Sequence, residues 1–292
     1  MFEKILVPLD GSENSEQALP VAEYLAGKLK SEVTLFTALE PVNGFERPFR
    51  IYLDKMVSDF STDRVRSELV TTPGGGAAAI LQYLAENKYD LIVLCTHGKT
   101  GPGLWAIGSV AAKVIQQARI PVLLLRSGSS EQTTVEQIFQ SILVPLDGSS
   151  LAESVIPYVQ HLASKLGSQA YPIRVIDTLK FPPVPVLNYA SGAALKDYEK
   201  DLAEMMTREA LQYINEKGIA LEGQGISATA VLLAGKPCQL IPQYATDTGI
   251  GLIAMTTHGF TGSQKVPYGS ITSRVLESSS QPVLLVRPEE LT

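Results

Sequence analysis

"KILVPLDGS" at Lys4–Ser12 returns 137 positions later as "SILVPLDGS" at Ser141–Ser149. In each copy a short apolar run ends in Asp-Gly-Ser, the pattern of a strand that is buried on both faces and stops at a turn. The chain has 292 residues, which is enough for about two domains. The repeated stretch therefore predicts one structural unit that the chain contains twice.

The sequence distance between matching residues is larger at the ends of the two copies than at their beginnings. "PVLLLR" at Pro121–Arg126 matches "PVLLVR" at Pro282–Arg287, and these stretches are 161 positions apart. The second copy therefore carries 24 additional residues, which fall between Asp177 and Gly235.

We expect two domains joined by a linker. The first spans 1–128, and the second spans 141–292 with an inserted loop and a longer helix within 177–235. The polar stretch Ser127–Gln137 lacks helical and strand periodicity, so we place the linker at 129–140.

Apolar patterns in the first unit alternate between strand and helix. They predict strands at Ile5–Leu9, Val33–Leu39, Leu69–Thr72, Leu91–Cys95 and Val122–Leu125, and helices at Ser15–Lys30, Ala77–Asn87 and Val110–Ala118. Strands that alternate with helices form a parallel sheet with helices on both faces. Such a sheet binds ligands outside the carboxyl ends of its strands, where the strand order reverses.

The second unit repeats this order with two differences. Its second helix is predicted at Leu195–Lys217, ending at Gly218 as a C-cap, after a proline-rich loop at Lys180–Gly192. Pro172 falls inside the expected second strand, which is an unfavourable position if that strand is central.

A glycine-spaced loop follows the fourth strand of each unit. Thr-His-Gly is followed by nine residues and then Gly-Ser, so Gly98 precedes Gly108–Ser109 and Gly259 precedes Gly269–Ser270. Gly98 and Gly259 permit a positive φ and a close ligand, and the Gly-Ser pairs open helices whose N-terminal amides favour phosphate. Neither copy contains a Walker lysine. The loop is predicted to cradle an anion, and the alternative is a tight turn with a serine cap.

Asp10 and Asp147 stand at the carboxyl end of the first strand in each unit. A carboxylate there can accept hydrogen bonds from ribose hydroxyls, as in dinucleotide sites. Asp-Gly-Ser by itself is typical of an Asx-turn or a helix cap. Beside the glycine loop, the two aspartates favour nucleotide binding. Ser150 and Glu153 fit a capping box and receive no functional role.

Two histidines and a tryptophan accompany the glycine loops. His97 and His258 could act as general bases, but the sequence pairs neither with a Ser, Cys or carboxylate. We interpret both as side chains that fix the strand-to-helix turn. Trp105 is the one tryptophan of the chain, and we interpret it as a packing residue.

The last strands, "VLLL" and "VLLV", carry no charge. Charged side chains usually protect the edge of a sheet from pairing with other strands. We therefore expect these two strands to pair with each other, which would make the chain an intramolecular pseudo-twofold dimer.

Composition excludes several classes of partner. The net charge of −6 and the pI near 5.2 provide no basic surface for nucleic acid. No apolar run reaches the ~20 residues of a membrane helix, and the N-terminus lacks the pattern of a signal peptide. Cys95 and Cys238 stand at non-equivalent positions, so we expect free thiols in the cytoplasm. The three histidines show no metal-ligand spacing, so no metal site is expected.

Taken together, "ILVPLDGS" twice, "THGKTG" and "THGFTG", the nine-residue step to Gly-Ser and the two "PVLL" stretches resemble the universal stress protein family in its tandem form. The resemblance covers nearly the whole chain. It implies an α/β fold of two Rossmann-like domains of the adenine nucleotide α-hydrolase type. Each domain would be a five-stranded parallel sheet of order 3-2-1-4-5 that dimerises through strand five. Assembly of whole chains into a homodimer stays open.

The resemblance also implies a nucleotide site in each unit. ATP-binding members carry Gly-x-x-Gly, nine residues, then Gly-Ser or Gly-Thr; here the first glycine falls on Cys95 and Thr256, where a Cβ narrows the room beside the ligand. The implied ligand is ATP or a related adenine nucleotide accompanied by Mg²⁺. The aspartates would hold the ribose, two strand backbones would meet the adenine, and the loop amides would hold phosphates. The implied binding residues are Pro8, Asp10, Ala38, Gly98, Gly108, Ser109 and Val110 in the first unit, and Pro145, Asp147, Val175, Gly259, Gly269, Ser270 and Ile271 in the second.

The leading hypothesis is a cytoplasmic stress-response protein that signals the occupancy of its nucleotide sites by a conformational change. No catalytic constellation supports fast turnover, and slow ATP hydrolysis stays open. The alternative is a nucleotide-free member that acts through protein contacts, with the inserted loop and helix as the partner surface. An adenylating enzyme is disfavoured, because Pro-Leu-Asp-Gly-Ser stands where a Ser-Gly-Gly-x-Asp-Ser loop would be needed.

Overall fold

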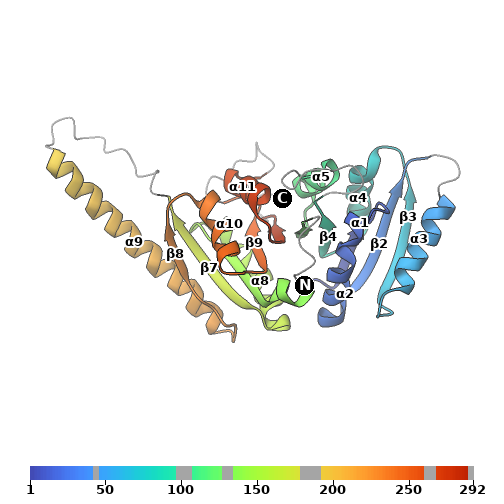
Figure 1. Ribbon diagram of the computed structural model, residues 1–292, viewed down its shortest axis with the longest axis horizontal. Coiled ribbons are helices and arrows are strands. Elements are labelled where there is room, and N and C mark those ends of the chain that lie inside the picture. Colours follow the sequence, from blue (N-terminus) through green and yellow to red (C-terminus); the bar gives the residue numbers. More distant parts are fainter. Residues whose placement is uncertain (42–45, 97–106, 127–133, 178–191, 260–267, 289–292) are drawn as a thin grey trace.

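A computed structural model describes residues 1–41, 46–96, 107–126, 134–177, 192–259 and 268–288. The two units lie side by side, and their strands join in one sheet of order β3-β2-β1-β4-β5-β10-β9-β6-β7-β8 (Figure 1). The strands are β1 (Lys4–Pro8), β2 (Glu32–Leu39), β3 (Val65–Thr71), β4 (Leu91–Cys95), β5 (Val122–Leu125), β6 (Ser141–Pro145), β7 (Gln169–Ile176), β8 (Val231–Ala234), β9 (Leu252–Thr256) and β10 (Val283–Val286). Each unit contributes five parallel strands in the order 3-2-1-4-5, which confirms the predicted fold class.

Helices cover both faces of the sheet. They are α1 (Glu13–Glu16), α2 (Ala18–Leu29), α3 (Glu46–Ser58), α4 (Gly75–Glu86), α5 (Ser109–Gln117), α6 (Val135–Gln140), α7 (Ser150–Glu153), α8 (Ile156–Leu166), α9 (Gly192–Glu222), α10 (Pro237–Asp247) and α11 (Ser270–Ser278). One buried cluster joins the sheet to α2, α3, α6, α8 and α9, and a second joins the other face to α4, α5, α10 and α11. The central strands are apolar on both faces because each face carries such a layer.

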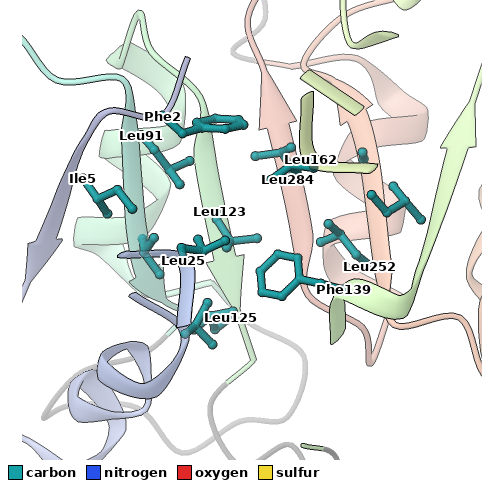
Figure 2. Close-up of a cluster of buried hydrophobic side chains, with 14 of the residues drawn as sticks. Phe2, Ile5, Leu25, Leu91, Leu123, Leu125, Phe139, Leu162, Leu252 and Leu284 are labelled. Carbon is teal, nitrogen blue, oxygen red and sulfur yellow. The ribbon is translucent and has the colours of Figure 1, made fainter. Parts of the chain in front are cut away.

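The two units meet at β5 and β10, which pair antiparallel with Leu123 opposite Leu284. All four residues of each strand are buried. On one face Leu123, Leu284 and Phe139 lie between the units (Figure 2). The ring of Phe139 stacks on Tyr24 with centroids 5.5 Å apart. Both buried clusters therefore continue across the junction.

A reciprocal pair of arginines also crosses this junction. Arg126, which follows β5, donates to the carbonyl of Leu276 in the last turn of α11. Arg287, which follows β10, donates through Nη1 to the carbonyl of Gln116 in the last turn of α5, 2.7 Å away. Cationic donors stabilise the carbonyl end of a helix, so each unit caps a helix of the other.

The first helix of each unit is broken where the sequence predicted it to be continuous. The predicted helix Ser15–Lys30 is a single turn, α1, followed by α2, and the second unit repeats the break between α7 and α8. Pro20 and Pro157 stand at equivalent positions near the start of the longer helices. Because proline has no N–H, neither can donate to the carbonyl four residues earlier.

Four other elements differ from the prediction. Helix α9 continues through Gly218 to Glu222, so Gly218 is not a C-cap. A Cβ at Gly218 would lie 3.5 Å from the Cβ of Ala230, so the helix approaches the chain before β8 closely there. Helix α3 was not predicted, and β3 begins at Val65 rather than Leu69. The polar stretch before β6 contains α6, whose capping box is formed by Thr134 and Gln137.

Pro172 lies inside β7, between β6 and β8, opposite Val144. Ala170 exchanges backbone hydrogen bonds with the chain that leads to β8, so the nitrogen of Pro172, two residues later, faces the same side. The ladder with β8 begins one residue later, at Ile173. The isolated bridge and β8 pair with β7 in the same register, so the gap between them falls where Pro172 has no N–H to donate.

Candidate functional site

The carboxyl ends of the central strands form a crevice in each unit. In the first unit β1 pairs with β2 on one side and β4 on the other, and in the second unit β6 pairs with β7 and β9. The chain connections therefore leave the central strand in opposite directions, which opens a space between them at the carboxyl edge. Each unit has a cavity at this place.

The cavity of the first unit has a volume of about 230 Å³. It brings together every predicted residue of this unit that the structure describes: Pro8, Asp10, Ala38, Gly108, Ser109 and Val110. Gly98, like His97 and Trp105, lies outside the described residues. The ends of β1 and β2 and the start of α5 thus surround one space, as the topology requires.

The cavity of the second unit has a volume of about 940 Å³. All seven predicted residues of this unit line it: Pro145, Asp147, Val175, Gly259, Gly269, Ser270 and Ile271. Side chains of α9 line it as well, among them Ala210 and Tyr213. The role of the predicted residues as ligand contacts stays a prediction.

Each aspartate closes a turn with one carboxylate oxygen. Oδ1 of Asp10 accepts hydrogen bonds from the backbone nitrogen of Ser12 at 3.0 Å and from its hydroxyl at 2.5 Å. Asp147 makes the same two bonds with Ser149. The Asx-turn is therefore real in both units. The other oxygen of Asp147, Oδ2, faces Gly259. It lies so close that a Cβ at Gly259 would collide with it.

Glycine at position 259 is explained by the close approach of Asp147 and not by a positive φ. Its φ lies outside the positive region that favours glycine. The prediction of a positive φ at this position is wrong. The glycine is required because Oδ2 of Asp147 occupies the space that a side chain would need.

The helix N-termini offer fewer free amides than predicted. The backbone N–H of Gly108 donates to the carbonyl of Thr96, and that of Gly269 donates to Thr257, each at 2.7 Å. These two glycine amides are thus engaged with the end of the fourth strand, whereas the resemblance implied that they hold phosphates; that role stays a prediction. The next amides belong to the first turns of α5 and α11, where helical geometry supplies no acceptor. They are the amides of Ser109, Val110, Ser270 and Ile271.

Cys95 and Thr256 end the fourth strand of each unit. Sγ of Cys95 lies 4.0 Å from the carbonyl oxygen of Ser15 in α1, so this side chain points toward α1. Burial raises the pKa of Cys95 to about 12, so its thiol is neutral and unreactive at physiological pH. The hydroxyl of Thr256 donates to the carbonyl of His258 at 2.6 Å. Both side chains are thus engaged with protein groups.

His258 is buried and fixes the turn after β9. Its Nδ1 lies 3.1 Å from Oγ1 of Thr257, and its carbonyl accepts the bond from Thr256. This arrangement agrees with a structural side chain in the strand-to-helix turn.

Comparison with known proteins then decides the family. The model of the universal stress protein family matches residues 1–126 and 139–287. The chain belongs to this family.

Individual relatives agree with that result. A universal stress protein of Methanocaldococcus jannaschii is 26% identical over 155 residues, which are 51% of this chain and 96% of that protein. Another from Synechocystis is 24% identical over 320 residues, which cover 98% of this chain and 100% of that protein. The solved universal stress protein of Archaeoglobus fulgidus has a TM-score of 0.67 at 17% identity, covering 98% of this chain and 96% of that one. This last likeness concerns the fold alone.

A universal stress protein solved in complex with cAMP is also similar to part of the chain. It covers 43% of this chain and 98% of its own at 21% identity, with a TM-score of 0.37. A likeness this small does not bear on the ligand of the present universal stress protein.

The second unit of this universal stress protein has a charged cluster that the sequence did not predict. Glu153 is not the partner of a capping box, since Ser149 is the N-cap of α7. Its carboxylate instead accepts a bond from the hydroxyl of Tyr213 at 2.9 Å and pairs with Lys217 at 2.7 Å. Burial and the bond to Glu153 raise the pKa of Tyr213. The sequence held a signal for this cluster, because the same two residue types recur in the first unit. Glu153 corresponds to Glu16 at the offset of 137, and Tyr213 corresponds to Tyr52 at the offset of 161.

Three further observations concern the part of the chain that the structure describes. Within it, no group of three or more His, Cys, Asp or Glu side chains could hold a metal ion. None of its helices is long and apolar enough to span a bilayer. Cys95 and Cys238 are both free thiols.

Proposed function

We propose that this universal stress protein binds ATP or a related adenine nucleotide in both units and acts as a nucleotide-linked switch in the cytoplasmic stress response. One observation carries the proposal. In each unit a carboxylate, two first-turn amides that have no acceptor within their own helix and the end of the second strand surround the same cavity. These groups are suited to a ribose, a phosphate and a planar base.

The phosphates would bind at the first turns of α5 and α11. A helix N-terminus combines N–H donors with the positive end of the helix dipole, so it stabilises an anion without a lysine. The serine hydroxyls at these turns add a donor. Phosphate oxygens would also be the main ligands of a companion Mg²⁺, since this ion is commonly held by nucleotide phosphates and water.

The residues at the altered glycine positions leave room for this ligand. Cys95 turns its sulfur toward α1, and Thr256 bonds its hydroxyl to the next turn. Both residues border their cavity, and the sulfur or hydroxyl of each is engaged with a backbone carbonyl rather than left pointing at a ligand. The substitution of the family glycine is therefore compatible with binding in both units.

The first test asks whether the purified protein carries nucleotide. We expect anion-exchange chromatography of the supernatant after denaturation to show ATP or ADP. Titration calorimetry with Mg-ATP should give dissociation constants on the order of micromolar. Asp10→Asn and Asp147→Asn should each weaken one site about tenfold, because a hydrogen bond to a charged acceptor is lost. Asp54→Asn, which changes an exposed carboxylate of α3, is the matched control.

An empty supernatant together with a flat titration at millimolar Mg-ATP would refute nucleotide binding. The second candidate would then stand, a universal stress protein that acts through protein contacts. Helix α9 favours it, because Met205, Leu211 and Ile219 of this helix are large apolar side chains that are exposed. A contiguous patch of exposed apolar side chains marks a surface that binds another protein, whereas single exposed apolar residues are common on any surface.

A further inference from the structure

The two units differ beside their equivalent aspartates. Arg174 in β7 and Thr37 in β2 are 137 positions apart, as are Asp147 and Asp10. Thr37 is buried, and its hydroxyl donates to the carbonyl of Leu9 at 2.9 Å. The first unit therefore has a neutral, hydrogen-bonded side chain where the second unit has a guanidinium.

The guanidinium of Arg174 lies against the turn that begins at Asp147. A Cβ at Gly148 would lie 3.1 Å from its Nη1. The ring centroid of Tyr213 lies 5.8 Å from its Cζ. Nε and Nη1 are buried and have no hydrogen-bond acceptor among the residues that the structure describes. Buried donors on a charged group are costly when unsatisfied, so this guanidinium is suited to an anion from outside the chain.

The neighbouring carboxylates are engaged with other groups. Oδ1 of Asp147 accepts both bonds from Ser149. Glu153 is held by Lys217 and by the hydroxyl of Tyr213. Neither arrangement supplies the acceptor that Arg174 lacks.

The guanidinium and the phosphate-binding turn line the same cavity. Ser270 and Ile271 of α11, Asp147, and Arg174 with Tyr213 all border it. A ligand held at α11 and Asp147 can therefore extend to Arg174 without leaving the cavity. Among its described residues, the first unit's cavity is lined by no side chain of α3, the counterpart of α9.

On the basis of the proposed function, in which Asp147 holds the ribose, we propose that the second unit binds an adenine nucleotide with an additional phosphate on its ribose 2′ or 3′ hydroxyl. One ribose hydroxyl bonds to Asp147, and the phosphate on the other meets Arg174. In dinucleotide sites a carboxylate binds the ribose hydroxyl, and a nearby arginine accommodates a ribose phosphate. A guanidinium fork also matches two phosphate oxygens. The first unit, with Thr37, takes a nucleotide without this phosphate.

Other charges restrict where the additional phosphate can lie. Glu209 and Asp177 also border the cavity, and their carboxylates repel a phosphate. The phosphate is stabilised only where Arg174 contacts it directly. The 2′- and 3′-phosphorylated ligands are therefore expected to differ in affinity.

The test is a set of calorimetric titrations of the full chain with AMP, adenosine 2′,5′-bisphosphate and adenosine 3′,5′-bisphosphate. At least one bisphosphate should bind one site per chain about tenfold more tightly than AMP, as expected for a charge-assisted hydrogen bond. Arg174→Thr, which installs the residue of the first unit, should lower that affinity to the level of AMP. Arg174→Lys should retain part of the preference, because lysine keeps the positive charge but lacks the paired N–H donors of the guanidinium. Arg208→Thr removes an exposed arginine of α9 and should retain all of it.

The outcomes separate this inference from the proposed function. If AMP and both bisphosphates bind the natural chain equally, the inference is overturned while nucleotide binding stands, and this comparison needs no variant. A preference that survives in folded Arg174→Thr overturns it too. If no adenosine phosphate binds, the proposed function fails and the inference fails with it.

Discussion

Gly259 and Asp147 belong to segments far apart in the sequence, yet no side chain fits between them. A Cβ at Gly259 would collide with Oδ2 of Asp147. We predict that Gly259→Ala displaces the carboxylate and lowers the nucleotide affinity of the second unit by about tenfold or more. Overpacking should also lower the free energy of unfolding by about 1–3 kcal/mol. Calorimetric titration with Mg-ATP and urea unfolding measure the two effects.

Gly27→Ala is the matched control for this substitution. A Cβ at Gly27 in α2 meets no atom within 4 Å, and the residue has no positive φ. Alanine there should leave binding unchanged and raise the free energy of unfolding by about 0.5–1 kcal/mol. Equal affinity and stability of Gly259→Ala and the natural chain would contradict the steric argument.

At the scale of residues, the sequence predicted which positions meet at the cavity but not what each one does there. Asp10 and Asp147 could be placed because the carboxyl ends of parallel strands share one edge of the sheet. The engagement of the Gly108 and Gly269 amides could not be predicted, because it depends on how the loop folds back onto the fourth strand. A role for Arg174 could not be predicted, because it depends on residues that are distant in sequence and close in space, such as Tyr213.

At the scale of elements, α9 is fastened to α7 by the ion pair between Glu153 and Lys217. The pair is 2.7 Å long, and its side chains are 30% and 24% exposed. We predict a coupling of about 0.5–1 kcal/mol in the free energy of unfolding from a double-mutant cycle of Glu153→Gln and Lys217→Met. Lys217→Met installs the residue that the first unit has at Met56.

A second pair on the same helix serves as the control. Lys200 and Glu204 are 3.9 Å apart and largely exposed, so the corresponding cycle should give a coupling close to zero. A Glu153–Lys217 coupling no larger than this value would show that the ion pair does not hold α9 in place.

The elements differ in how far the sequence specifies them. β4 and β5 were predicted with the correct bounds, because short apolar runs between polar residues leave little choice. Helix α3 was missed although Phe49, Leu53, Met56 and Val57 recur at helical spacing, with Leu53 and Met56 buried. Gly218 looked like a helix end, but tertiary packing against Ala230 accounts for it instead. Propensity predicts an element only where packing does not override it.

At the scale of the molecule, the junction of β5 and β10 makes two repeated units into one sheet. The junction joins the same elements that carry the candidate sites. Helix α5 begins at the cavity of the first unit, and its last turn accepts the bond from Arg287 of the second. Arg126 makes the reciprocal bond to α11. A movement of either helix on ligand binding would therefore act on the other unit directly, which a nucleotide-linked switch requires.

A charge placed in this junction tests whether the two units depend on each other. Leu124 is buried and lies opposite Val283. We predict that Leu124→Glu lowers the free energy of unfolding by at least about 3 kcal/mol, because a buried carboxylate would have no partner. Small-angle scattering should show separated units or aggregates. Leu211→Glu, on the exposed face of α9, should leave both properties unchanged. If Leu124→Glu stays as compact and as stable as the natural chain, the pairing of the last strands does not hold the two units together, and coupling between the sites must take another route.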